Sequence, residues 1–293
     1  MNMGKHLSVV LVSVISSLFI MATHVEARSY SFSVDRFQVF GNLPNGNFDE
    51  FNDGVLDPWT IQGGTAVESS DVLTLSNPGQ VENFLQNNLE VTQERSSVEV
   101  SATTGAFAVA EGSGDFTVES RWLPVLPDLN LSYGMTFHYP PTEFDQVRIG
   151  IDNIDALNLS LLGAPEGMLP GSYISFLQIS PQPGMGLLNL SFEYQAVPVA
   201  AEDITGDIVF QLIFNDATDS FSAAFSLDGG STFTQPFSPF SIPSLSGSID
   251  PFVELEVISK TVRPVPVPPT LILLGSGLAG LAIFGRKRLF KKV

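Results

Sequence analysis

The sequence has no cysteine and only three histidines among its 293 residues. Without cysteine the chain can form no disulfide and no thiolate metal site, and it has no thiol for redox chemistry. His138 is the one histidine beyond residue 24, and no Gly-x-Ser-x-Gly motif stands near it. A catalytic triad or a transition-metal site would therefore depend on this side chain alone, so we expect neither.

Basic residues are also scarce, with 13 Lys and Arg against 31 Asp and Glu. The region from Arg28 to Arg263 holds 30 of the acidic residues and seven of the basic ones, so it carries 23 more negative than positive charges. Phosphate binding needs clustered Lys and Arg, so we expect no nucleic-acid partner. An excess of carboxylates instead suits solubility and the binding of divalent cations such as Ca²⁺.

Residues 1–27 are typical of a secretory signal peptide. Lys5 and His6 precede an apolar run over residues 7–21, and small residues lead up to a cleavage site after Ala27. An uncleaved membrane anchor is the alternative, but the run is short for a membrane span. The sequence therefore predicts an exported protein.

The other end of the chain reads as three consecutive segments. Alternating prolines in residues 263–270 fix φ and remove amide donors, which predicts a stiff, extended linker. An apolar helix over residues 271–285 would be about 22 Å long, less than the roughly 30 Å of a bilayer core, so it would span by thinning the membrane. Residues 286–293 form a basic tail that is expected to stay on the cytoplasmic side. Its basic residues are Arg286, Lys287, Arg288, Lys291 and Lys292.

A proline box, a Leu- and Gly-rich apolar stretch and a terminal basic cluster together resemble the PEP-CTERM sorting signal. The box reads Val265, Pro266, Val267, Pro268, Pro269, Thr270, with Val267 where the usual box has Glu, as in a less common variant. The resemblance implies recognition by a membrane protease-transpeptidase, exosortase, in Gram-negative bacteria that make exopolysaccharide. It also implies a precursor anchored in the inner membrane and a mature protein in the cell envelope, on the surface or in the matrix. A plain C-terminal anchor is the alternative.

The body between these ends, residues 28–262, reads as an all-β protein. Apolar residues alternate with polar ones over 116–122 and 129–137, as in strands with one buried face. The segments 208–214 and 221–227 flank a turn-rich loop and predict an antiparallel hairpin. So many short strands favour a two-sheet β-sandwich or jelly roll, although a split into two domains near residue 165 stays open.

The stretch from Asp49 to Trp59, with Gly63-Gly64-Thr65 and Val72-Leu73-Thr74-Leu75 after it, is similar to the opening of concanavalin A-like lectin/glucanase domains. The segment Phe225-Ser226-Leu227-Asp228-Gly229-Gly230 resembles the later strands of that superfamily. The resemblance covers residues 47–259, and it implies a β-jelly roll more than an activity.

The best enzymatic candidate is Glu143 with Asp145, because laminarinase-type hydrolases of that superfamily carry carboxylates on alternate strand positions. Arg148 stands where the acid/base Glu should be. A retaining glycosidase needs two carboxyl groups about 5 Å apart. The required set is incomplete, so the sequence predicts no enzyme.

Calcium is the cofactor that the composition favours, as a structural ion. The candidate ligands are Asp49, Glu50 and Asp250, with Asp53 and Asp57 near the first two, and two further oxygen-rich loops lie at 152–155 and 216–219. None has the spacing of an EF-hand. The aromatic residues available to stack on sugars are Trp59, Trp122, Tyr133 and Tyr139, but their alternation with polar residues predicts that they fill the core.

The sequence therefore predicts an exported cell-surface or extracellular-matrix protein, sorted by an exosortase, with an adhesive or matrix-associated role. A lectin-like module that binds exopolysaccharide or other glycans is one alternative. A divergent glycoside hydrolase is another.

Overall fold

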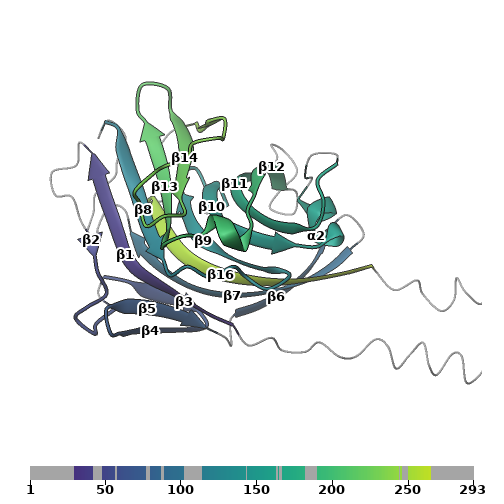
Figure 1. Cartoon of the computed structure of the whole chain (residues 1–293). Helices are drawn as coiled ribbons and strands as arrows, with labels where there is room; N and C mark the ends of the chain where they lie inside the picture. The colour runs from purple at the N-terminus through teal and green to yellow at the C-terminus, as the bar shows by residue number, and fades with distance from the viewer. Residues whose placement is uncertain are drawn as a thin grey trace, which may run out of the picture. The chain divides into compact units, whose positions relative to one another are not determined.

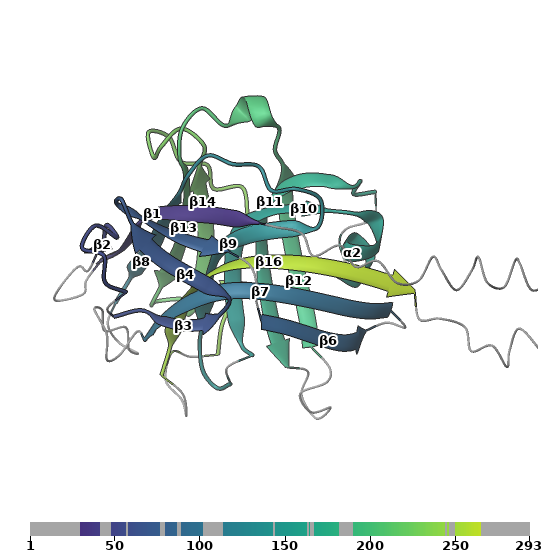
Figure 2. The same ribbon diagram turned by 90° about the horizontal axis from the view of Figure 1, so that it is seen from below.

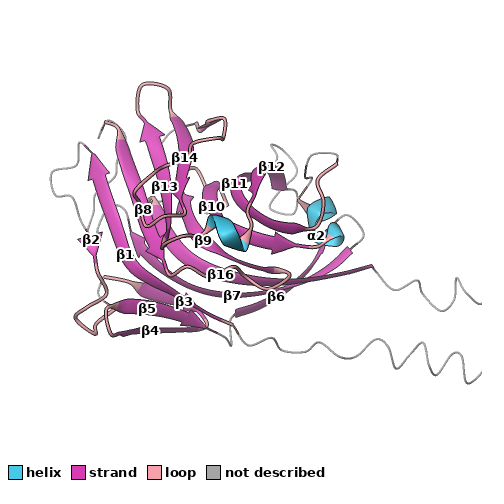
Figure 3. Ribbon diagram, viewed as in Figure 1, coloured by secondary structure: helices cyan, strands magenta, loops and turns pink. Residues whose placement is uncertain are grey.

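The structure is a computed structural model, and Figure 1 shows how its strands are arranged. It describes residues 30–41, 48–56, 58–76, 80–86, 89–101, 114–142, 144–162, 164, 167–181, 190–243, 245 and 250–264. The chain divides into two compact units, Met1–Tyr30 and Ser31–Val293, and every described strand and helix belongs to the second. Figure 3 shows that this unit is built almost wholly of strands.

The strands form two antiparallel sheets, which confirms the all-β, two-sheet prediction. Sheet A has the order β15-β14-β13-β8-β1-β5-β4, and β2 pairs with β1. Their bounds are β15 Phe240–Ser241, β14 Ser220–Ser226, β13 Ile208–Asn215, β8 Phe116–Trp122, β1 Ser31–Gly41, β5 Val72–Ser76, β4 Thr65–Ser69 and β2 Phe48–Asp49. The pairing of β13 with β14 confirms the predicted hairpin.

Sheet B has the order β12-β11-β10-β9-β16-β7-β3, and β6 pairs with β7. The bounds are β12 Leu190–Pro198, β11 Gly171–Pro181, β10 Gln146–Ile154, β9 Leu131–His138, β16 Phe252–Pro264, β7 Leu89–Ser101, β3 Thr60–Gly63 and β6 Gln80–Gln86. Figure 2 shows β3 and β6 one after the other along the edge of β7 that faces away from β16. Because β10 pairs with β11, the chain before and after residue 165 lies in one sheet, so the two-domain alternative is wrong.

The main core lies between the two sheets. Trp122 of β8 contacts Tyr133 of β9 with ring centroids 4.9 Å apart, and Phe137 of β9 contacts Phe221 of β14 at the same distance. Trp122, Tyr133 and Tyr139 are fully buried, and Trp59 is nearly so. The aromatic side chains considered for sugar stacking therefore fill the core, as their alternation with polar residues predicts.

A second, smaller core lies on the opposite side of sheet B. The short helix α2, Ala156–Leu161, begins at Asp155, whose side chain accepts a hydrogen bond from the Asn158 amide. Leu159 and Leu162 pack there against side chains of β11 and β12. The members of this cluster are Ile154, Leu159, Leu162, Tyr173, Leu177 and Tyr194. The other short helix, η1, spans Ala201–Asp203 and leads into β13.

The final strand is longer than the sequence suggests. We expect a last strand over 252–258, but β16 continues to Pro264, and its last two residues pair with Glu90 and Leu89 of β7. The first two residues of the expected linker are therefore part of the sheet. The proline box 265–270, the apolar segment 271–285, the basic tail 286–293 and the signal peptide 1–27 lie outside the described residues. None of the helices described has the length and apolar character that a membrane span requires.

Candidate functional site

Sheet B has an unusual outer face, by which we mean the face turned away from sheet A. Successive residues of a strand point to opposite sides, so Val253, Leu255 and Val257 of β16 face the main core while Glu254 and Glu256 face outward. The strand register places charged and hydroxyl side chains of four neighbouring strands beside these two glutamates. We call the following set the outer-face network: Arg95, Thr136, His138, Arg148, Asp152, Ser175, Glu254 and Glu256.

Arg148 of β10 is the centre of the network. Its Nε donates to Oε1 of Glu256 at 2.9 Å, and its Nη1 donates to Oδ1 of Asp152 at 3.1 Å. Thr136 Oγ1 donates to the same Glu256 oxygen at 2.7 Å, and Ser175 Oγ donates to Asp152 Oδ2 at 2.5 Å. Each buried carboxylate thus has a guanidinium and a hydroxyl partner, which offsets the cost of removing it from water.

Glu254 has a different set of partners. Its Oε2 lies 3.2 Å from Nη1 of Arg95 and 3.2 Å from Nε2 of His138. The His138 ring stacks on Phe252 with centroids 4.0 Å apart, which fixes its orientation. Arg95 Nη1 also lies 4.0 Å from Glu256 Oε2, so this arginine connects the two glutamates.

Gly150 makes room for the Arg148 side chain, and Gly134 makes room for the backbone of Gly150. Gly134 and Gly150 are direct partners in β9 and β10. A β-carbon at Gly150 would lie 2.8 Å from Nη2 of Arg148 and 2.5 Å from the Tyr133 carbonyl oxygen. The guanidinium therefore lies against bare backbone, which no larger residue at position 150 would allow.

The environment shifts the pKa values of several groups on this face. Burial acts to raise the pKa of Glu254, but the hydrogen bond with His138 and the charge of Arg95 outweigh it, so that pKa is lowered. Burial, and then the charge of Glu254, raise the pKa of Glu99, its cross-strand partner on β7. Burial and the charge of Arg148 lower the pKa of Lys260. Glu254 and Glu99, which face each other across β16 and β7, therefore have pKa values shifted in opposite directions.

Two polar atoms of this region have no hydrogen-bond partner in the structure: Nη2 of Arg148 and the hydroxyl of Tyr194. Both side chains are almost completely buried. Asp152 and Arg148 are the charged groups with the largest influence on Tyr194, whose pKa burial raises. Both atoms are sealed from solvent, so an enclosed water molecule is the simplest partner for them, and Ser175 lies within reach of the Tyr194 hydroxyl.

Of the residues that the sequence offered for catalysis, the structure describes Asp145 and Arg148. Asp145 Oδ2 accepts hydrogen bonds from the amide and the hydroxyl of Thr142, at 3.1 and 2.7 Å, and so holds the turn between β9 and β10. Glu143 lies outside the described residues. Arg148 belongs to the outer-face network, and the nearby carboxylates are Glu256 and Asp152.

The residues proposed for calcium lie in different settings. Asp49 accepts from the Phe51 amide at 2.8 Å and from Trp59 Nε1 at 2.9 Å, while Glu50 pairs with Arg36 at 3.1 Å. Asp250 is exposed. In the part of the chain that the structure describes, no three acidic or histidine side chains are gathered to hold a metal.

The two other acidic loops have local tasks. Asp152 takes part in the outer-face network, and Asp155 accepts the amide of Asn158 at the start of α2. The amide of Asp216 donates to Asp115 in the loop at the end of β13. The carboxylates of the first loop are therefore engaged, whereas the contact of the second loop uses the Asp216 amide and not its carboxylate.

Sequence reasoning missed Glu254 and Glu256 as site residues. The signal was present, because glutamate alternates with Val253, Leu255 and Val257. Such alternation normally indicates a solvated face, and only the register with β7, β9 and β10 shows the partners that make burial possible.

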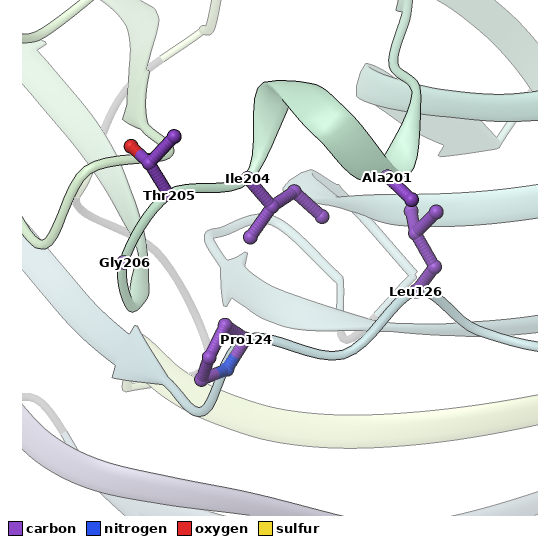
Figure 4. A pocket seen from close by; sticks show the side chains of 6 residues that line it. All are labelled: Pro124, Leu126, Ala201, Ile204, Thr205 and Gly206. Atoms are coloured by element: carbon purple, nitrogen blue, oxygen red, sulfur yellow. The ribbon is translucent and has the colours of Figure 1, made fainter.

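A cavity of about 320 Å³ lies between the β8–β9 connection and the segment that holds η1. Figure 4 shows Ile204 pointing toward the segment that carries Pro124 and Leu126. The lining residues are Pro124, Leu126, Ala201, Ile204, Thr205 and Gly206. None of them is titratable, so the cavity can offer apolar contacts but no acid, base or charged ligand.

Comparison with known proteins leaves the chain without a family. No family model and no curated protein matches it. Among solved structures, basic winged bean lectin with Tn-antigen has 11% identity and a TM-score of 0.31 over 80% of this chain and 99% of that chain. The Bauhinia forficata lectin in complex with GalNAc has 9% identity and a TM-score of 0.23 over 82% and 100%. Winged bean acidic lectin has 7% identity and a TM-score of 0.19 over 80% and 100%. These structures are similar to the chain only at this low level, so the function is argued from its own residues.

Proposed function

We propose that this chain is an exported protein of the cell surface or extracellular matrix, sorted through its C-terminal tail by an exosortase, with an adhesive or matrix-associated role. The observation that carries the proposal is the order of the tail: proline box, short apolar segment, basic cluster. The box presents extended backbone at the outer surface of the inner membrane, and the basic residues hold the apolar segment 271–285 at a fixed depth. The inner membrane holds the precursor, and the envelope or matrix receives the mature protein.

The body supports this role in two ways. It is a β-sandwich without cysteine, so its folding needs no oxidant and no disulfide exchange. Its excess of 23 negative charges over residues 28–263 favours solubility and keeps copies apart outside the cell.

The test is the intact mass of the mature protein purified from its native host. We expect a form that has lost the apolar segment and all five basic residues of the tail, with the cut within or just after residues 265–270. Changing Pro266 and Pro268 to Ala should slow this cut and leave a membrane-embedded precursor. The matched control is Pro239→Ala, in an exposed loop of the body.

A mature protein that still carries residues 271–293 would contradict sorting and leave a plain anchor. A mature protein found in the cytosol would contradict export itself. Changing Arg286, Lys287 and Arg288 to Ala should disturb retention before the cut, and normal retention in that variant would remove the role given to the basic cluster.

Glycan binding by the body is a second candidate function, favoured by Nη2 of Arg148 and the Tyr194 hydroxyl on the outer face of sheet B. Both atoms are sealed from solvent, so a sugar can reach them only if the segments that cover them move aside. Sugar hydroxyls can donate and accept, so they match such a pair. Stacking contributes less here, because among the described aromatic side chains only Phe233, at 42%, is largely exposed. Recognition would rest on hydrogen bonds.

Tyr194→Phe tests this second function because it removes one hydroxyl and keeps the ring. Binding of the full chain to a glycan array and to the host's exopolysaccharide should weaken by tenfold or more. The control is Tyr139→Phe, which removes a buried hydroxyl that already accepts from Gln178 at 2.8 Å. Equal binding by both variants and the wild type would exclude the outer face as the site.

A glycoside hydrolase is the third alternative, and its test is direct. Hydrolysis of a panel of β-glucans should be measured for the wild type and for Glu143→Gln. Activity that falls in the variant would favour an enzyme over a matrix protein. No activity in either would remove this alternative.

A further inference from the structure

Glu68 of β4 occupies a position that the strand pattern reserves for an apolar residue. Ala66 and Glu68 are the buried residues of this strand, and Thr65, Val67 and Ser69 are exposed. The Glu68 side chain is only 9% exposed. A carboxylate at the buried edge of sheet A needs a specific partner.

One oxygen of this carboxylate is satisfied and the other is not. Oε1 accepts from the amides of Asp53 and Gly54, at 3.0 and 2.7 Å. Oε2 is buried and has no hydrogen-bond partner in the structure. An unpaired buried oxygen of a charged group costs more than a net hydrogen bond contributes, so the native protein should supply something at this point.

Neighbouring carboxylates increase the need for a positive partner at Glu68. The carboxyl groups of Asp53 and Asp49 lie close enough to Glu68 for their negative charges to repel its own. Arg36 is paired with Glu50. A proton on Glu68 or a bound cation would each relieve the repulsion between these carboxylates.

We propose that Glu68 and Asp53 hold a divalent cation of the Ca²⁺ type, with Asp49 beside them and with water and backbone oxygens as the remaining ligands. Each oxygen of Asp49 has accepted one N–H and retains a lone pair. Asp53 is exposed, so the ion has a route from solvent. Ca²⁺ takes six to eight oxygens in flexible geometry, waters included, so it does not require three carboxylates already in place.

This assignment differs from the ligands that the sequence suggested. It retains the Asp49 region and brings in Glu68, which is 15 residues from Asp53 in sequence. It leaves out Glu50, which is paired, and Asp250. The site is independent of the function proposed for the tail and the outer face.

The experiment uses the full chain, stripped with chelator and titrated with CaCl₂ by calorimetry, with thermal unfolding in parallel. We expect a dissociation constant of about 0.1–1 mM, the range of extracellular calcium modules. The melting temperature should rise by about 5 °C in 10 mM CaCl₂ beyond NaCl of matched ionic strength. Glu68→Gln should lower the affinity at least tenfold.

The control for removing one carboxylate is Asp71→Asn, at an exposed turn between β4 and β5, which should bind Ca²⁺ as the wild type does. If Glu68→Gln does not fold, Asp53→Asn replaces it, because Asp53 is exposed and Asn can keep the bond from the Val55 amide. Equal stabilisation by CaCl₂ and NaCl would overturn the proposal. The proposal would also be overturned if Glu68→Gln melted at a higher temperature than the wild type and calcium did not change the melting temperature of the wild type. That result would mean that the Glu68 carboxyl is protonated in the native protein.

Discussion

On strand β16, the residues that face sheet A are Val253, Leu255 and Val257, and the residues that face away from it include Glu254 and Glu256. The first three are fully buried, and the two glutamates are 2% and 3% exposed. The two faces of the strand are thus equally removed from water, although one is apolar and the other charged. The inner side chains need only shape and contact, whereas the outer ones need partners of opposite charge from other strands.

The two faces should therefore respond differently to mutation. Truncating an inner residue leaves a cavity, and the loss in free energy of unfolding grows with the cavity volume. Truncating an outer residue leaves its partner charged, buried and unpaired, and the loss in free energy of unfolding is then the desolvation penalty of that partner. The predictions below separate these two kinds of damage.

The largest effect is expected for Arg148→Met, because it leaves Asp152 and Glu256 without their guanidinium. The free energy of unfolding at pH 7 should fall by about 3–5 kcal/mol in urea titrations. The control is Arg36→Met, in a half-exposed pair with Glu50, which should cost less than about 1 kcal/mol. Similar losses in the two variants would mean that burial on the outer face has no special cost.

A smaller loss is expected on the inner face for Leu255→Ala. The side chain is fully buried against the main core, so its truncation should cost about 3 kcal/mol. Replacing Arg148, Asp152 and Glu256 together by apolar residues of similar volume should recover most of the Arg148→Met loss. Leu255→Ala has no such rescue, because no partner is left charged. If the triple variant is less stable than Arg148→Met alone, the partners are not the source of the cost.

On the outer face of β16, protons should act through Glu254. Its pKa in the folded protein is held below the ordinary value of 4.5, so the unfolded chain binds its proton first as the pH falls. Its contribution to stability is therefore complete above pH 4.5 and is lost as the pH falls through the folded pKa. Urea unfolding between pH 7 and pH 3 should show a shallower dependence in Glu254→Gln than in the wild type. Glu202→Gln, in the exposed η1, serves as the control, and equal slopes in all three proteins would contradict the pairing with His138 and Arg95.

The smallest effect is expected for a half-buried carboxylate that is paired with hydroxyl and amide groups and not with a charge. Asp228 accepts from the hydroxyls of Ser226 and Thr232, each at 2.6 Å, and from the Thr232 amide at 2.9 Å. These bonds lower its pKa to about 2. An NMR titration should give that value, and Thr232→Val should raise it toward the ordinary 3.8. An unchanged pKa in the variant would show that the Thr232 hydroxyl does not stabilise the charge.

The sequence predicted the inner side of the molecule well. Alternation in 116–122 placed Trp122 in the core, and the turn-rich loop after residue 214 predicted the β13–β14 hairpin, because both depend on neighbours in the chain. The outer face was not predicted. Glu256 and Thr136 are 120 residues apart and become hydrogen-bond partners only through the register of β16 with β9, which local patterns do not contain.

The candidate calcium residues show the same limit. Asp49 and Asp53 lie in one acidic stretch, so the sequence shows that they are close together. Glu68 belongs to a short strand, where a charged residue normally indicates a side chain that faces solvent. Its burial follows from the loop that folds over it, through the amides of Asp53 and Gly54. The sorting tail and signal peptide lie outside the described residues, so these assignments stay predictions.

The place of β16 in sheet B has a consequence for the order of folding. This strand lies between β9 and β7, yet it is the last strand described in chain order. Until residues 252–264 have been synthesised, β7 and β9 have no partner between them, and the charges of Arg95 and Arg148 lack both glutamates. Pairing across such long separations is slow, because loop closure must precede the contacts that reward it. The amino-terminal 250 residues should therefore wait in a partly formed, aggregation-prone state that depends on chaperones, and a nascent chain halted before Phe252 should remain sensitive to protease.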